Sequence, residues 1–107
     1  MSWWMLRRNL LAQSNLSNFA ERPFELEGAK YRNVESAFQA RKLDYSYFYR
    51  DYDGEPNDSY FEMREKFEDV SGQEARKLGK RIAGLDVNSW DKVSSGVMKM
   101  LIKESFK

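Results

Sequence analysis

The segment Asn15–Lys42 constrains the fold more than any other part of the chain, because turn and capping signals divide it at defined points. Pro23–Glu27 alternates apolar and polar residues, the period of a half-buried strand. Gly28 can supply the positive φ of a tight turn, and Ala29–Tyr31 returns as a second short strand. Asn33 is a good N-cap for a helix that begins at the next residue and runs to the end of the segment. The segment therefore predicts a loop, a hairpin and a capped helix.

Three polar residues of that helix fall on one face. Glu35, Gln39 and Lys42 stand at positions i, i+4 and i+7, which place side chains on the same side of a helix. One interpretation is a solvated stripe, the usual fate of charged residues on a helix. The other is a carboxylate, an amide and an ammonium group that line a polar cleft for a ligand.

The composition limits the available chemistry. The chain has 107 residues, enough for one domain, and its 18 basic and 17 acidic residues leave a net charge of +1. It contains neither Cys nor His, which excludes disulfides, thiol nucleophiles, histidine bases and zinc sites built on histidine. Carboxylates, amides, hydroxyls and lysines remain. A magnesium site built from oxygen ligands stays open, but no clustered carboxylate motif calls for one, and we expect no cofactor and no metal site.

The first residues form an apolar run that charge interrupts. In Met1–Gln13, two tryptophans, Met5 and Leu6 precede Arg7 and Arg8. This order differs from that of a signal peptide, and the run is too short to span a membrane. The segment is interpreted as a first strand packed on the domain, as a terminus that docks a partner or a second copy, or as a weak interfacial anchor.

The segment Leu43–Tyr60 is the most aromatic part of the chain, and it contains a loop rich in turn formers at Asp53–Asp58. Aromatic side chains among charges can stack on nucleobases. The neighbouring charges are mainly acidic, which disfavours a path for phosphates. Core packing and loop anchoring are the first interpretation here, and stacking on a ligand base is the second.

Three further helices are expected. Tyr60–Asp69 has an amphipathic pattern. Ser71 and Glu74 form a capping box for a helix that ends near Ala83. Asn88 is the expected N-cap of the last helix. The inner face of that last helix is predicted to contain Trp90, Val93, Val97 and Leu101.

The helix after Ser71 carries the strongest basic patch of the sequence, formed by Arg76, Lys77, Lys80 and Arg81. A solvated basic face is the first interpretation, and a clamp for a phosphate or diphosphate is the second. Gly79 has a low helix propensity. Its presence predicts the close approach of another element or of a ligand.

Two blocks of the chain resemble the NADAR (YbiA-like) family. The first block consists of Leu16-Ser17-Asn18-Phe19, Pro23-Phe24, Gly28, Tyr31, Glu35, Gln39-Ala40 and Lys42. The second consists of Glu74–Arg81, Trp90, Val97-Met98, Lys103 and Phe106. Two ordered blocks are far more specific than either alone. The chain has Ser36 where the family usually has His, and it ends at Lys107, before a C-terminal segment that family members carry.

The resemblance implies an N-glycosidase that cleaves a bond between ribose and a base nitrogen. Its substrate classes would be early riboflavin-pathway intermediates or ADP-ribose attached to guanine. The resemblance places Glu35 and Trp90 at the catalytic positions.

We therefore expect residues 1–107 to form one mainly helical α+β domain with a small β-hairpin, similar to YbiA. In the expected site Glu35 stabilises positive charge on the ribose or activates water, by analogy with glycoside hydrolysis. Asn18, Gln39 and Lys42 are predicted to orient hydroxyl or phosphate groups of the substrate. Phe19 or Trp90 is predicted to stack on the base. Phosphate is predicted to bind to Lys77, Lys80 and Arg81.

Other functions stay open at this point. A catalytically inactive domain that binds a nucleotide, ADP-ribose or a protein would keep the same cleft. Direct nucleic-acid binding through Arg7, Arg8 and the aromatic loop is weaker, because the net charge is close to zero; nucleic acid is expected only as the carrier of a modified base. We expect a cytoplasmic protein with a small-molecule substrate and no membrane partner. A dimer in which one chain completes its neighbour's site is a further interpretation.

Overall fold

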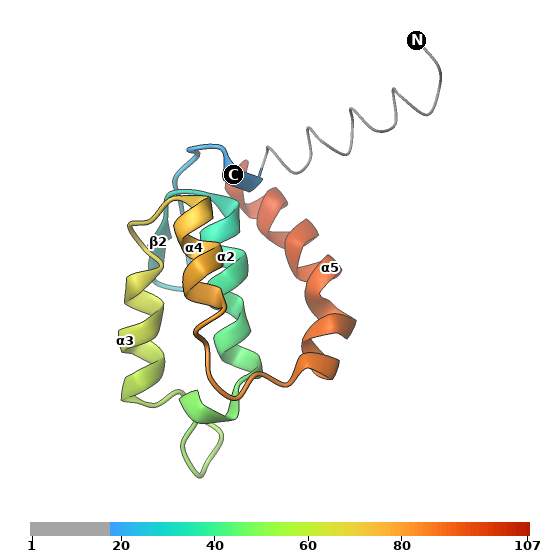
Figure 1. The fold of residues 1–107 in the computed structure, drawn as a ribbon. Coiled ribbons are helices and arrows are strands. Elements are labelled where there is room, and N and C mark those ends of the chain that lie inside the picture. The colour runs from blue at the N-terminus through green and yellow to red at the C-terminus, as the bar shows by residue number, and fades with distance from the viewer. Residues whose placement is uncertain (1–17) are drawn as a thin grey trace.

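The computed structural model describes residues 18–107, which form a mainly helical α+β fold as predicted (Figure 1). The expectations for Met1–Gln13, including those for Arg7 and Arg8, concern residues outside this range. The order of elements is β1 (Phe24–Leu26), β2 (Ala29–Tyr31), α2 (Val34–Arg41), two short 3-10 helices η1 (Lys42–Tyr45) and η2 (Tyr47–Tyr49), α3 (Asp58–Lys66), α4 (Gly72–Gly79) and α5 (Val87–Ser105).

The predicted hairpin is confirmed. β1 and β2 pair antiparallel, with Phe24 opposite Tyr31 and Leu26 opposite Ala29. Gly28 takes the expected positive φ of 82° in the turn, and Glu27 before it also has a positive φ, 52°. Two successive positive φ angles match the right-handed twist of the strands in a tight hairpin.

The N-cap of α2 is also confirmed, and it belongs to a small buried polar cluster. Asn33 Oδ1 accepts a hydrogen bond from the Ser36 backbone N–H at 2.8 Å. Asn33 Nδ2 donates to the Val70 carbonyl at 3.0 Å, and Ser36 Oγ lies within hydrogen-bonding distance of both Asn33 Oδ1 and that carbonyl. The cluster connects the start of α2 to the loop before α4.

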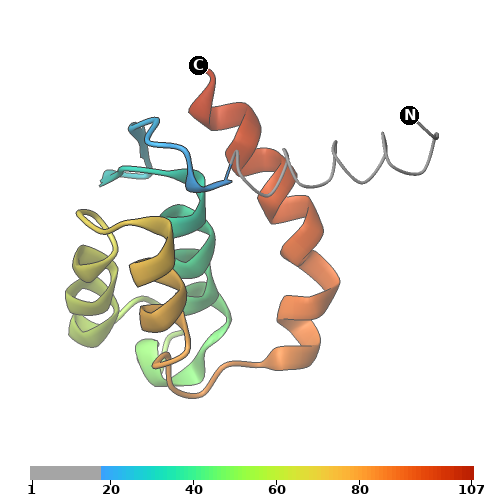
Figure 2. The ribbon, with the colours of Figure 1, turned by 45° about the horizontal axis from the view of Figure 1, so that its top comes forward.

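Helix α2 is the central element. It packs against α4 on one side and against α5 on another (Figures 1 and 2). Ala37 and Ala40 are 3% and 4% exposed, and their small side chains allow the neighbouring helices to approach. Larger buried apolar residues complete the core around α2, namely Tyr31, Val34, Leu43, Tyr49, Tyr60, Phe67, Ile82 and Leu101.

The boundaries of the later helices differ from the predictions. α3 begins at Asp58 behind an N-cap at Asn57, whose side chain accepts from the Tyr60 backbone N–H. The predicted cap at Ser71 is confirmed, but α4 ends at Gly79 and not near Ala83. α5 begins at Val87 behind Asp86 and not behind Asn88. At the starts of α3 and α5 the sequence offers several capping residues close together, and the structure uses Asn57 and Asp86.

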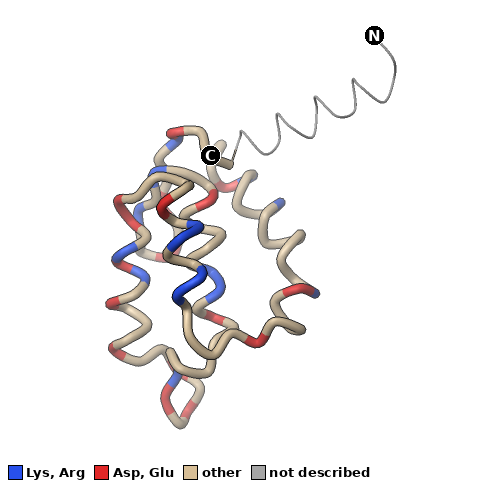
Figure 3. Tube along the Cα trace, in the orientation of Figure 1, with Lys and Arg blue, Asp and Glu red and all other residues tan. Residues whose placement is uncertain are grey.

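The aromatic segment divides into two groups. Tyr49 and Tyr60 are buried at 5% and 8% exposure, which agrees with core packing. Tyr47, Phe48 and Tyr52 are exposed. The acidic loop next to these residues lies at the end of the molecule opposite the C-terminus (Figure 3).

Candidate functional site

The polar face of α2 is buried where α4 covers it, so the interpretation of a solvated stripe is wrong for its first two residues. Glu35 is 5% and Gln39 6% exposed. Gln39 Nε2 donates a hydrogen bond to Glu35 Oε1 at 3.0 Å, one helical turn away. A buried carboxylate is costly without partners, and this amide supplies one of them.

Gly79 explains how the amide fits between the helices. A Cβ at residue 79 would overlap Gln39 Oε1 and come within 2.8 Å of Gln39 Cδ. The predicted close approach at Gly79 is therefore confirmed, and the approaching group is the Gln39 side chain. Gln39 Oε1 is buried and has no hydrogen-bond partner among residues 18–107. The close fit thus aims the amide nitrogen at Glu35 and leaves the amide oxygen without a donor.

Arg76 of α4 completes the surroundings of Glu35. Its Nε lies 3.6 Å from Glu35 Oε1, and its guanidinium carbon lies 5.5 Å from the centre of the Phe19 ring. That ring packs against Gly72, where a Cβ would overlap it. The structure therefore places Phe19 beside Arg76, and its stacking on a base stays a prediction. It also adds Arg76 to the surroundings of Glu35, and this pairing depends on the packing of α2 against α4.

Lys42 is half-buried at the end of the same face. Burial lowers the pKa of its ammonium group, the Glu35 carboxylate raises that pKa, and the Arg76 guanidinium lowers it. The carboxylate is thus close enough to both cations to influence them. A buried carboxylate beside an amide donor and two cations can accept a proton from water or oppose a developing positive charge.

Asn18 is the least defined of the predicted contacts. Its side chain is half-buried, and Oδ1 has no hydrogen-bond partner in the described part of the chain. It neighbours Phe19 in the sequence, which brings its backbone to the Phe19 end of the site. No described contact joins it to Glu35.

The predicted phosphate residues of α4 are not all on the Glu35 side. Basic residues gather along α4 (Figure 3), but Lys77 and Arg81 line a separate hollow of about 400 Å³ together with Lys66. Lys80 is exposed and follows the last residue of α4. Because the helix stops at Gly79, the regular spacing expected for the whole patch is lost.

Trp90 packs inside the fold. It is 6% exposed, and its ring centre lies 5.1 Å from that of Phe38 and 5.6 Å from that of Tyr45. These contacts favour its interpretation as a core anchor, and none of them involves Glu35. The catalytic role of Trp90 stays a prediction without support from its packing.

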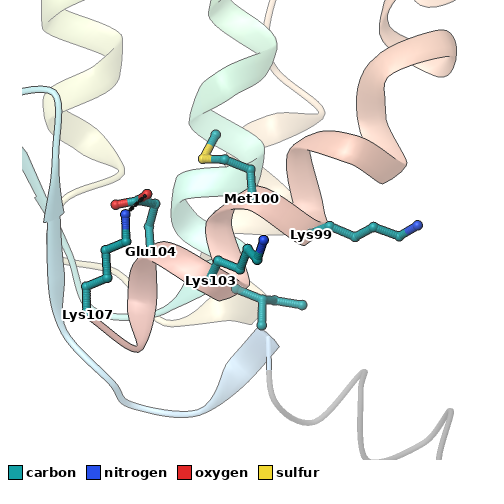
Figure 4. A pocket seen from close by; sticks show the side chains of 6 residues that line it. Lys99, Met100, Lys103, Glu104 and Lys107 are labelled. Carbon is teal, nitrogen blue, oxygen red and sulfur yellow. Dashed lines mark hydrogen bonds and ion pairs between the residues drawn. The ribbon is translucent and has the colours of Figure 1, made fainter.

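Other surfaces lack the predicted site residues. A hollow of about 890 Å³ lies on the second half of α5 and is lined mostly by lysines and apolar residues (Figure 4).

Among residues 18–107 no group of three acidic side chains is close enough to hold a metal ion. No described helix has the length and apolar character needed to cross a membrane.

Comparison with protein-family models, with characterised proteins and with solved structures finds no match.

Proposed function

We propose that the chain is an N-glycosidase-type domain that hydrolyses the bond between ribose and a base in a nucleotide-like substrate. The observation that carries this proposal is the Glu35 carboxylate, which is buried against α4 and held by Gln39. The resemblance of the surrounding motif to the NADAR family supports it independently and gives the substrate class, an ADP-ribosyl or riboflavin-intermediate type of ribosyl compound.

The proposed reaction breaks the bond from the ribose anomeric carbon to the base nitrogen, and the bonding electrons leave with the base. The sugar then carries positive charge in an oxocarbenium-like state. Glu35 opposes this charge and takes a proton from the water that attacks the anomeric carbon. The departing base nitrogen takes up a proton from solvent, and Glu35 later returns its own proton to solvent. The Gln39 amide keeps the carboxylate in place, and Lys42 binds a hydroxyl or phosphate oxygen. The Phe19 ring offers a surface on which a base can stack.

The test compares Glu35→Gln with the unaltered protein. The substrates are ADP-ribosylated guanine in DNA, free ADP-ribose, NAD and ribosylaminopyrimidine phosphates, and chromatography measures the released base. We expect the unaltered chain to release base from one of these, and Glu35→Gln to lower the rate at least a hundredfold. Glu74→Gln is the matched control, because Glu74 is exposed on α4. Equal rates in Glu35→Gln and the unaltered chain would contradict the role of Glu35.

A second candidate is a domain that binds the nucleotide without cleaving it. The observation in its favour is that Arg76 lies against the carboxylate, so the carboxylate is paired with a cation of the protein itself. Saturable binding of ADP-ribose without base release from any substrate would establish this alternative. Absence of both binding and release would exclude both candidates.

A further inference from the structure

The contact between Arg76 and Glu35 joins an exposed side chain to a buried one. The Arg76 side chain is 63% exposed and that of Glu35 is 6% exposed. Arg76 is therefore the solvent-exposed partner of a buried carboxylate. A ligand that approaches from solvent on the Arg76 side meets the guanidinium.

The contact is looser than another arginine–carboxylate pair of the same protein. Arg32 binds Glu21 through two hydrogen bonds of 3.0 and 3.2 Å, the two-pronged geometry that makes such pairs strong. The closest approach of Arg76 to Glu35 is from Nε at 3.6 Å, beyond the distance of a good hydrogen bond. The N–H donors of the Arg76 guanidinium thus make no hydrogen bond to Glu35.

Each partner has a second support. The guanidinium of Arg76 lies over the Phe19 ring, a cation–π arrangement that does not need the carboxylate. Glu35 keeps its hydrogen bond from Gln39 at 3.0 Å. The Arg76–Glu35 contact can therefore open while both side chains stay ordered.

We propose that Arg76 is a ligand-binding residue that exchanges partners. Without a ligand it pairs with Glu35; when a ligand with a phosphate or diphosphate group binds, the guanidinium turns to the phosphate oxygens and uncovers the carboxylate. Arginine matches phosphate with two parallel N–H donors, a better partner than the single loose contact to Glu35. The inference rests on the proposed function, because it assigns the anionic part of the ligand to the Glu35 site.

Inorganic pyrophosphate serves as the probe, since it carries the diphosphate charge and has no base to release. Its binding is measured by calorimetry at low salt. Arg76→Gln is expected to weaken binding about tenfold, through loss of a charge-assisted hydrogen bond. Arg81 lines the other hollow of α4 and is itself a predicted phosphate residue, so it does not serve as the control. Arg32→Gln is the matched control, because Glu21 holds the Arg32 guanidinium, and it is expected to leave binding unchanged.

Glu35→Gln tests the exchange itself. Removal of the competing carboxylate is expected to tighten pyrophosphate binding about twofold to fivefold. Simple repulsion between Glu35 and the anion would give the same change, so the substitution is repeated in Arg76→Gln. If Arg76 mediates the effect, the tightening disappears in this background. Tightening of equal size in both backgrounds would overturn the exchange.

A measurement on the unaltered protein does not depend on how the variants fold. The Arg76 side-chain Nε–H resonance is followed by NMR as pyrophosphate is added, and it is expected to shift while that of Arg81 does not. A shift of Arg81 alone would place the anion in the other hollow and overturn the inference. Failure of the proposed function is a separate result, namely no base release from any ribosyl substrate while Arg76 still binds pyrophosphate.

Discussion

At the scale of single residues, the site depends on a glycine that gives room to a side chain. Gly79 lies at the last position of α4, and the space a Cβ would occupy there is filled by the Gln39 amide. Glycine is unfavourable in a helix by up to about 1 kcal/mol relative to alanine. Gly79 therefore lowers the stability of α4 slightly, and it leaves room for the Gln39 side chain between α2 and α4.

Gly79→Ala is expected to change the free energy of unfolding by less than about 1 kcal/mol, because the gain in helix propensity offsets part of the overlap with Gln39. The overlap moves the amide, so the hydrogen bond from Gln39 Nε2 to Glu35 is expected to break. Base release should then fall about tenfold to a hundredfold through misplacement of the carboxylate. Urea unfolding and the NMR signals of the Gln39 amide protons measure the two effects.

Gly96→Ala is the matched control for this substitution. Gly96 lies within α5, and a Cβ there has no close neighbour within 4 Å among residues 18–107. This variant is expected to stabilise the protein by up to about 1 kcal/mol and to leave the Gln39 signals unchanged. Unchanged Gln39 signals in Gly79→Ala as well would contradict the packing between α2 and α4.

At the scale of elements, the last helix shows how a cap is selected among neighbouring candidates. Asp86 Oδ1 accepts a hydrogen bond from the Ser89 backbone N–H at 3.2 Å, and Oδ2 accepts one from Ser89 Oγ at 2.7 Å. These bonds from Ser89 lower the pKa of Asp86. Its backbone N–H donates to the Tyr45 carbonyl at 2.8 Å. This contact with η1 fixes Asp86 in place, which local spacing cannot show.

Asp86→Ala is expected to lower the free energy of unfolding by about 1 kcal/mol, the usual effect of removing an N-cap. Asn88→Ala, at the cap that spacing alone predicts, should change it by less than about 0.5 kcal/mol. Urea unfolding at neutral pH compares the two variants. A larger loss in Asn88→Ala than in Asp86→Ala would contradict the observed start of α5.

At the scale of the whole molecule, two buried tyrosines of the core make the stability of the fold depend on pH in the alkaline range. Burial raises the pKa of Tyr31 from 10.0 to about 12. Burial, reinforced by the Asp44 carboxylate, does the same for Tyr60, whose hydroxyl donates to Asp44 Oδ1 at 2.9 Å. The folded chain therefore keeps protons on these phenols at a pH where the unfolded chain has lost them.

The contribution of Tyr31 and Tyr60 is fully present below pH 10 and is expected to be lost as the pH rises to about 12. Because the pKa of Lys42 is lowered in the folded chain, Lys42 makes the free energy of unfolding rise with pH, but only up to its ordinary pKa of 10.5. Urea unfolding across this pH range measures the loss. Tyr60→Phe is expected to reduce the slope of the free energy of unfolding against pH. Tyr52→Phe, at an exposed loop position, is expected to leave this slope unchanged. Equal slopes in the unaltered protein and both variants would contradict the role of Tyr60.

Much of the fold could be predicted because its signals are local. The turn at Gly28, the cap at Asn33 and the cap at Ser71 each depend on residues within four positions of one another, and each is confirmed. The mainly helical α+β class follows from these elements. The shared face of Glu35 and Gln39 was also available from helical spacing alone.

The rest could not be predicted, because it depends on residues far apart in the sequence. Spacing alone could not show whether the face of Glu35 and Gln39 meets solvent or another helix. It also could not show that Arg76 pairs with Glu35, or that Trp90 packs against Phe38 and Tyr45.

By itself the sequence determined the elements, their order and the polar residues available for chemistry, because helix caps, turns and periodicity act over a few residues. The tertiary structure decided which of those residues are buried, which of them meet and where α4 ends. Burial and ion pairing arise only when α4 packs on α2, and this packing brings a carboxylate, an amide and a guanidinium together at one site.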